Sequence, residues 1–294
     1  MGRIEKYTFE YKEFIEYHLH SKEVRKCQSS TEKGKSFYGT STIEEADEIA
    51  MCIKEWEEGK KMLEELRDSC PEMFTPRIEG LALQFQYDVA GCMVDVGRYL
   101  DGEPECMVDF IISDSDKDGK IVDIYYEFTN NCDINTKDMM SYGIAVLALV
   151  DDLESRGFSC NIYAVGTTYE RGKSVDEITT ITIKKAGEAL NVEAIMYAFH
   201  PSFFRRHWFA FHERKPYCAS GYGKSEIPTK YNNEDVMAYF NDNPKRSFLI
   251  PPVSTLGKRN SPIKYYEKIK EKVENQMEEI DNGKIPQPTD KFKL

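Results

Sequence analysis

The residues from Asp114 to Gly119 carry the side chains of a calcium-binding loop. Carboxylates occupy alternate positions, at Asp114, Asp116 and Asp118, and Gly119 follows them. Carboxylates at this spacing before a glycine form the first half of such a loop, because they surround a hard cation with oxygen ligands. The twelfth position, which supplies a bidentate acid in these sites, is Tyr125. A hairpin turn at Asp118 and Gly119 explains the same residues without calcium, and we favour the turn.

A second set of oxygen donors follows a predicted strand. Glu127, Thr129 and Asn131 lie at alternate positions, and side chains at the carboxyl end of a parallel strand are well placed to bind a ligand or cation. Their spacing resembles the Asp-x-Ser-x-Ser metal motif of von Willebrand factor A domains, although Glu and Asn depart from that pattern. The resemblance covers roughly residues 122 to 185. It implies, as an alternative function, a degenerate ligand- or metal-binding module, or a small hydrolase with its site at Thr129, Asn131 and Thr167.

A dense basic and aromatic cluster, residues 200–215, contains three of the five histidines of this acidic chain. The arginine fork binds phosphate and carboxylate groups equally well, so the cluster is a candidate for binding a partner. The residues predicted to do so are Arg205, Arg206, His207 and Arg214. The alternative is a structural helix whose arginines pair with surplus acids of the same chain, and we favour it slightly.

A strand, a helix and a second strand surround these candidates in the sequence. Residues 122–129 are rich in β-branched and aromatic side chains, which is typical of a buried strand. Residues 139–156 predict a helix that is apolar on every face early on, and residues 160–165 predict another strand. Such a unit favours a right-handed crossover between parallel strands. We therefore expect a mixed α/β fold: a three-layer-like sheet with crossover helices, an N-terminal arm and a C-terminal helix.

The remaining elements are predicted from periodicity and turn residues. Residues 107–112 and 121–128 flank an acidic turn and predict a hairpin. Residues 81–96 are ambiguous between strand and buried helix. Further predicted elements are helices over 42–70, 191–199 and 234–240, and a strand over 179–184.

The domain organisation that we predict has three parts: an arm over residues 1–40, a core over 41–257, and a helix with a disordered tail over 258–294. The last helix begins at Ser261 and Pro262, which are typical of a helix start. Its apolar residues form a narrow seam at three- and four-residue spacing: Tyr266, Ile269, Val273, Met277 and Ile280. This seam predicts contact between copies in a homo-oligomer. Docking onto the core of the same chain would bury it equally well.

Composition excludes several classes of protein. The net charge of −12 and the pI of about 5.1 argue against direct nucleic-acid binding. No apolar run is long enough for a membrane span or a signal peptide, so we expect a soluble protein of the cytoplasm. The eight cysteines are dispersed without metal-ligand spacing. No nucleophile or phosphate-loop motif occurs, and we expect neither a cofactor nor an enzymatic activity.

Two short patterns resemble a family of bacteriophage and prophage proteins. The first holds Gly143, Ala145, Val146, Leu149, Leu153, Glu154 and Gly157; the second is His200-Pro-Ser-x-x-Arg205-Arg206. In size and acidic character the chain is also similar to phage inhibitors of the Gabija nuclease and helicase defence complex. This resemblance implies a non-enzymatic binding protein in the host cytoplasm whose partner is a bacterial antiphage defence complex.

Overall fold

The computed structural model describes most of the chain outside four longer gaps. The described residues are 3–51, 56, 61, 64, 84–89, 93–94, 96–100, 102–111, 121–155, 158–168, 175–188, 192–214 and 247–281. Several predictions therefore lie outside the described residues. These are the calcium loop with Asp114, Asp116 and Asp118, most of residues 52–70, the helix over 234–240, and the tail after Asp281.

The main sheet has five strands in the order β1-β7-β6-β5-β8. They are β1 (Arg3–Glu10), β5 (Ile121–Glu127), β6 (Ser159–Thr168), β7 (Val175–Lys184) and β8 (Ser247–Ile250). Only the pair β6 and β7 is antiparallel among these neighbours. The predicted strand, helix, strand unit is present: β5, then α7 (Thr136–Ser155), then β6 parallel to β5. The prediction of a mixed α/β fold is confirmed.

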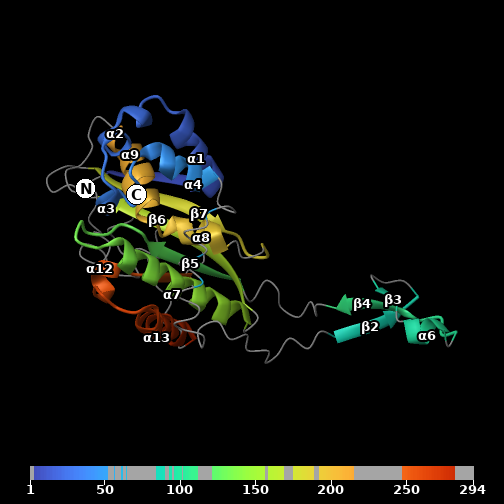
Figure 1. Cartoon of the computed structure of the whole chain (residues 1–294). Coiled ribbons are helices and arrows are strands. Elements are labelled where there is room, and N and C mark those ends of the chain that lie inside the picture. Colours follow the sequence, from blue (N-terminus) through green and yellow to red (C-terminus); the bar gives the residue numbers. More distant parts are fainter. Residues whose placement is uncertain are drawn as a thin grey trace.

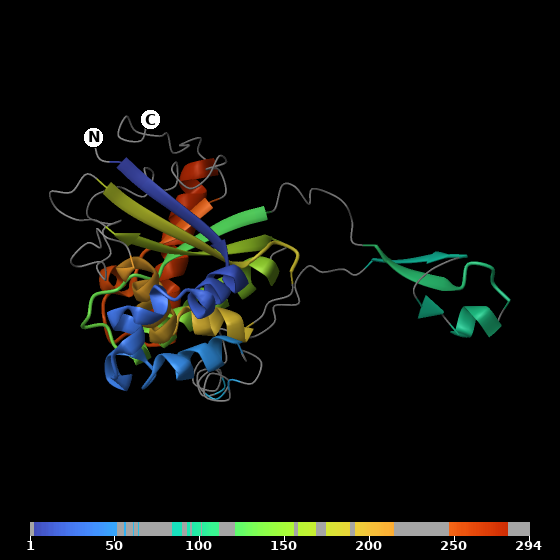
Figure 2. The same cartoon turned by 90° about the horizontal axis from the view of Figure 1, so that it is seen from above.

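Helices gather mainly on one face of this sheet, as Figures 1 and 2 show. The β5 side chains that point to this face are apolar and fully buried, as at Ile124 and Tyr126. Helix α7 is buried along most of its length, including residues 139–150, because α8 (Val192–Ala198), α13 (Pro262–Asp281) and β6 all contact it. A helix that is apolar on every face requires this coverage.

A second, three-stranded antiparallel sheet lies apart from the main one (Figures 1 and 2). It has the order β2-β4-β3, from β2 (Gln84–Asp88), β3 (Met93–Val94) and β4 (Met107–Ile111), with α6 (Val96–Leu100) between β3 and β4. The predicted hairpin of residues 107–112 with 121–128 is therefore wrong. Strand β4 pairs with β2 and β3, because β5 is a central strand whose two edges are occupied by β6 and β8.

The segment predicted as an arm packs on the core of its own chain. Strand β1 forms an edge of the main sheet, parallel to β7. After it come α1 (Tyr11–His20), η1 (Val24–Lys26), α2 (Gln28–Thr31), α3 (Lys35–Tyr38) and α4 (Ile43–Met51). Phe14 and Val24 are fully buried. Residues 3–40 thus contribute a strand and core side chains to the main sheet.

The seam of α13 also packs within the chain. Ile269 and Val273 are buried in the main core, and Tyr266 is half-buried against Ala148 of α7. Of the two possibilities for the seam, the structure shows docking on the chain's own core. None of the helices in the described part of the chain combines the length and the apolar character that a membrane crossing requires.

Candidate functional site

The basic and aromatic cluster forms a π-helix, η5 (Phe203–Trp208), which continues into α9 (Phe209–Glu213). A π-helix has a wider turn than an α-helix and is common at functional sites. Every side chain of η5 is buried, including Arg205, Arg206 and His207. The polar residues predicted to bind a partner therefore point into the protein.

Arg205 binds backbone carbonyl groups from two other segments. Its Nη1 donates to Phe37 O at 2.9 Å, and its Nη2 donates to Ile134 O at 2.7 Å and Asn131 O at 3.2 Å. The guanidinium also lies over the Phe37 ring, 4.4 Å from its centroid. Burial lowers the pKa of Arg205 to about 10, so the group keeps its charge at neutral pH.

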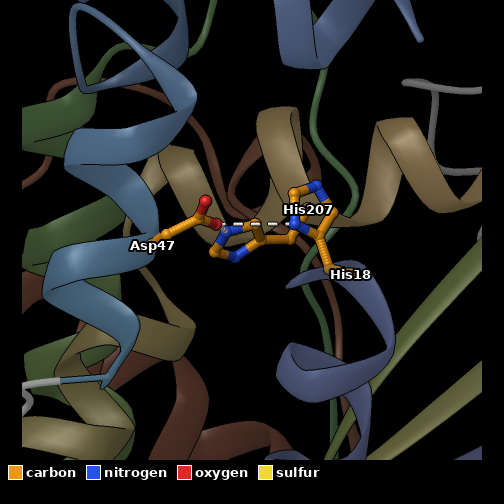
Figure 3. Close-up of side chains that lie close together, drawn as sticks. All are labelled: His18, Asp47 and His207. Carbon is orange, nitrogen blue, oxygen red and sulfur yellow. Dashed lines mark hydrogen bonds and ion pairs between the residues drawn. The ribbon is translucent and has the colours of Figure 1, made fainter. Parts of the chain in front are cut away.

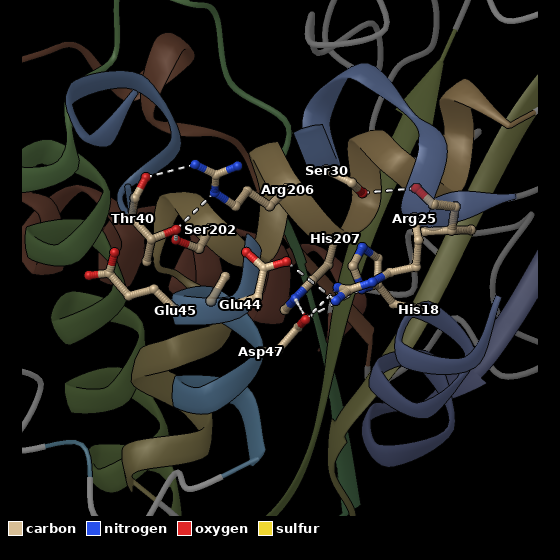
Figure 4. A network of polar contacts seen from close by, with 12 residues as sticks. His18, Arg25, Ser30, Thr40, Glu44, Glu45, Asp47, Ser202, Arg206 and His207 are labelled. Carbon is tan, nitrogen blue, oxygen red and sulfur yellow. Dashed lines mark hydrogen bonds and ion pairs between the residues drawn. The ribbon is translucent and has the colours of Figure 1, made fainter. Parts of the chain in front are cut away.

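Arg206 fastens the N-terminal segment to η5 in the same way (Figure 4). Its Nε and Nη2 donate to Thr40 Oγ1 and Thr40 O, each at 2.8 Å. Its Nη1 donates to Ser29 O at 3.0 Å and Glu32 O at 3.1 Å. Both arginines thus form their hydrogen bonds within the chain, as the structural alternative expects. Their acceptors, however, are carbonyl and hydroxyl oxygens and not the carboxylates that we expected.

Two imidazoles and a carboxylate form a buried cluster, which Figure 3 shows. His18 comes from α1, Asp47 from α4 and His207 from η5. Asp47 Oδ1 lies 3.1 Å from His207 Nε2 and 3.5 Å from His18 Nδ1. Arg25 Nη1 donates to the other oxygen, Asp47 Oδ2. The cluster joins three elements that are far apart in the sequence.

The electrostatics of the cluster leave the imidazoles neutral and the carboxylate charged. Burial lowers the pKa of His207 to about 4, although Asp47 opposes the shift. Burial also lowers the pKa of His18. Burial by itself raises the pKa of Asp47, but the two histidines beside it favour its ionised form and hold that pKa well below its usual range. Neutral imidazoles and an ionised carboxylate are the protonation states that ligate a metal ion.

The sequence-based prediction included His207 but missed His18 and Asp47. Residues 1–40 were interpreted as an arm, so His18 was not considered as a core residue. The sequence does hold a signal for Asp47, because Ala46 and Ala50 place it on the apolar face of its helix. An acid on such a face is a candidate buried charge, which requires a partner.

Glu127 and Thr129 lie together, as the predicted cation motif requires. Thr129 Oγ1 donates to Glu127 Oε1, and Thr167 Oγ1 donates to the same oxygen at 3.1 Å. These three side chains are buried, whereas Asn131 is exposed and accepts a hydrogen bond from Arg205 through its backbone oxygen. The predicted third ligand is therefore exposed while the other two are buried.

The other predicted partner-binding residues lie at different places. Arg214 is half-buried, with its guanidinium 4.8 Å from the Phe211 ring centroid. Tyr266 is half-buried, and Ile269 and Val273 are buried under α7. The structure brings together Arg205, Arg206 and His207, whereas Ile269 and Val273 of the α13 seam are buried in the core.

A family model described as "Domain of unknown function (DUF7192)" matches residues 4–274. No curated protein and no solved structure matches the chain. The matched range contains both sheets and all three members of the His18, Asp47 and His207 cluster.

Proposed function

The chain belongs to this family, and because the family's description assigns no function we propose one from the geometry. We propose that the protein is a bacteriophage-encoded, non-enzymatic binding protein that inhibits a nuclease and helicase defence complex in the host cytoplasm. The observation that carries the proposal is the exposed apolar surface of the small sheet and of α6. We call the segment from the start of β2 to the end of β4, residues 84–111, the appendage.

The appendage exposes apolar side chains that a folded protein ordinarily buries. Leu100 is 77% exposed, Tyr99 64% and Val94 46%. Of the six large apolar residues that are exposed in the described part of the chain, four belong to the appendage. Clustered exposure of this kind marks protein interaction sites, and tyrosine is among the side chains that contribute most to binding. The appendage therefore supports a role in protein binding.

The charge of the appendage indicates the chemistry of the partner. Residues 84–111 contain six carboxylates and a single cation, Arg98, and Arg98 pairs with Glu103. An acidic surface with an apolar centre complements a basic surface with apolar pockets. Proteins that act on nucleic acid carry basic clefts of this kind. We infer that the appendage occupies the DNA-binding cleft of a nuclease or helicase subunit.

The proposal is tested with purified protein and a purified Gabija complex. We expect the protein to bind the complex and to suppress its DNA cleavage. Tyr99→Ser with Leu100→Ser should weaken binding at least tenfold, which corresponds to the loss of roughly 1.4 kcal/mol or more. Because both side chains are exposed, the melting temperature of the variant should remain close to that of the wild type.

Met51→Ser is the matched control, because Met51 is 66% exposed on α4, outside the appendage. This variant should bind and inhibit like the wild type. If the wild-type protein neither binds nor inhibits the complex, the proposed function is wrong. If binding is intact in the double variant, the inhibitor proposal stands and the appendage is not its contact surface.

A further inference from the structure

The geometry of His18, Asp47 and His207 points to a metal site. We propose that these three residues bind a divalent transition-metal ion, zinc in the first instance, which joins α1, α4 and η5. Each residue offers one ligand atom, and all three atoms lie within 4.8 Å of one another. This inference is independent of the proposed function, because it concerns buried residues of α1, α4 and η5 and not the appendage.

Two of the three separations match those of ligands on a tetrahedral ion. Two ligands held at about 2.0 to 2.1 Å from zinc at the tetrahedral angle lie about 3.3 Å apart. Asp47 Oδ1 lies 3.1 Å from His207 Nε2 and 3.5 Å from His18 Nδ1. Two imidazole nitrogens with one carboxylate oxygen form a donor set suited to zinc and neighbouring transition metals, whereas Mg²⁺ and Ca²⁺ prefer oxygen ligands alone.

The hydrogen bonds of Tyr197 indicate that a positive charge, either an ion or a proton, lies between His207 and Asp47. The Tyr197 hydroxyl donates its hydrogen to Ala46 O at 2.9 Å, so its oxygen can only accept from His207 Nδ1, 3.4 Å away. A proton on Nδ1 leaves Nε2 of a neutral imidazole as a bare lone pair. That lone pair faces a carboxylate oxygen, and the two repel each other unless a cation or a second proton lies between them. A hydrogen bond to the ring nitrogen that does not face the metal, as Tyr197 makes here, commonly fixes the tautomer of a metal-binding histidine.

His18 supplies a second, independent observation. Its side chain is 1% exposed, and neither of its ring nitrogens has a hydrogen-bond partner. A buried polar group without a partner is costly and rare, and a bound ion is one of its recognised explanations. A single ion beside Asp47 Oδ1 would satisfy Nδ1 of His18 and Nε2 of His207 together, which a single proton cannot do.

Arg25 is compatible with this site. Its guanidinium binds Asp47 Oδ2, so Oδ1 is left to face the ring nitrogens, and outer hydrogen bonds of this kind orient ligating carboxylates. Arg25 Nη2 also lies 3.7 Å from Glu44 Oε1, and the arginine side chain is 31% exposed. Glu44 and solvent therefore offset much of the charge that Arg25 brings near the ion.

The proposal is tested on the full chain. Protein stripped with EDTA and dialysed should take up an equimolar amount of zinc, measured by elemental mass spectrometry, with a rise in melting temperature. Millimolar Mg²⁺ or Ca²⁺ should cause no rise. Co²⁺ should give the visible absorption of a tetrahedral site, a readout that general stabilisation of the fold does not produce.

The variants are His18→Gln and Asp47→Asn, with His20→Gln as the matched control, since His20 is an exposed histidine on the same helix. His18→Gln should lower zinc affinity at least tenfold, and His20→Gln should leave it unchanged. If a variant fails to fold, the stoichiometry and the cobalt spectrum of the wild type still decide the question. A wild-type chain that takes up no zinc or cobalt, or a His18→Gln variant that binds zinc as the wild type does, would falsify the proposal.

Discussion

At the scale of single residues, two buried arginine side chains hold the N-terminal segment against the core by donating hydrogen bonds to backbone carbonyl groups. Arg205 and Arg206 donate to backbone oxygens of residues 29–40 and 131–134. This arrangement suits irregular segments, whose carbonyl groups lack partners within a helix or sheet and need donors when buried. The arginines therefore anchor the short helices α2 and α3, which are too brief to be stable alone.

We predict that Arg206→Ala destabilises the protein strongly. The substitution leaves the acceptors at Ser29, Glu32 and Thr40 without their donor, and unsatisfied buried groups make the loss roughly 3 kcal/mol or more. Urea unfolding measures this change. Lys264→Ala, which removes an exposed cation, should change stability by less than about 0.5 kcal/mol. An Arg206→Ala variant as stable as the wild type, with reduced partner binding, would show that the arginine is a contact residue.

His200 makes stability depend on pH. Burial lowers its pKa from 6.5 to about 3, and its Nδ1 accepts a hydrogen bond from Ser202 N at 3.3 Å, which holds the ring in its neutral form. Because the folded-state pKa is lower than the unfolded one, the contribution is complete above pH 6.5 and is lost as the pH falls toward the folded value. We expect His200 to account for a loss of about 1.5 kcal/mol between pH 6.5 and pH 5.

Chemical unfolding at a series of pH values tests this prediction. His200→Gln should flatten the dependence by that amount, because glutamine does not titrate in this range. His20→Gln, at an exposed position on α1, is the matched control. Equal slopes for His200→Gln and the wild type would contradict the assignment to His200.

At the scale of elements, prediction from sequence succeeded where one local pattern decides the structure. The β-branched run before residue 129 and the apolar run at 144–150 admit little other than a buried strand and a covered helix, and β5 and α7 are both present. The start of α13 at Pro262 was likewise predicted from its own residues.

Prediction failed where the partner of an element decides its structure. The pairing of β4 with β2 depends on which edge is available, and no turn between neighbouring segments reveals that. The same limit applies to the α13 seam: Ile269 fits a coiled coil and the chain's own core equally well, and the structure places it in the core. A homo-oligomer remains a prediction, but Ile269 and Val273 are buried within one chain, so copies would have to meet through another surface.

The candidate site shows the same division. Arg205, Arg206 and His207 are visible in the sequence because they are adjacent. Asp47 and His18 join them only after β1 and α1 have packed on the sheet, over separations that no local pattern spans. The π-helical turn, in which every successive side chain is buried, also depends on this packing. The sequence indicates a helix there but not its π-helical form.

At the scale of the whole molecule, the excess of acidic residues gives the protein a long-range field. The net charge is −12, and fields of this kind accelerate encounter with a basic partner more than they raise final affinity. An appendage that is both acidic and apolar at its exposed surface would be drawn to a basic cleft and then held there by apolar contact. Charge and apolar surface are therefore expected to affect different rate constants.

We predict that added salt slows association of the protein with the Gabija complex and changes dissociation little. Glu105→Lys, at an exposed position of the appendage, should reduce the association rate about threefold or more at low salt. The reduction should fade at 1 M salt, where the screening length is about 3 Å. Glu267→Lys changes the net charge equally at an exposed position on α13. Surface plasmon resonance across a salt series separates the two variants: a local effect slows only Glu105→Lys, whereas equal slowing in both would mean that net charge, and not the appendage, steers the encounter.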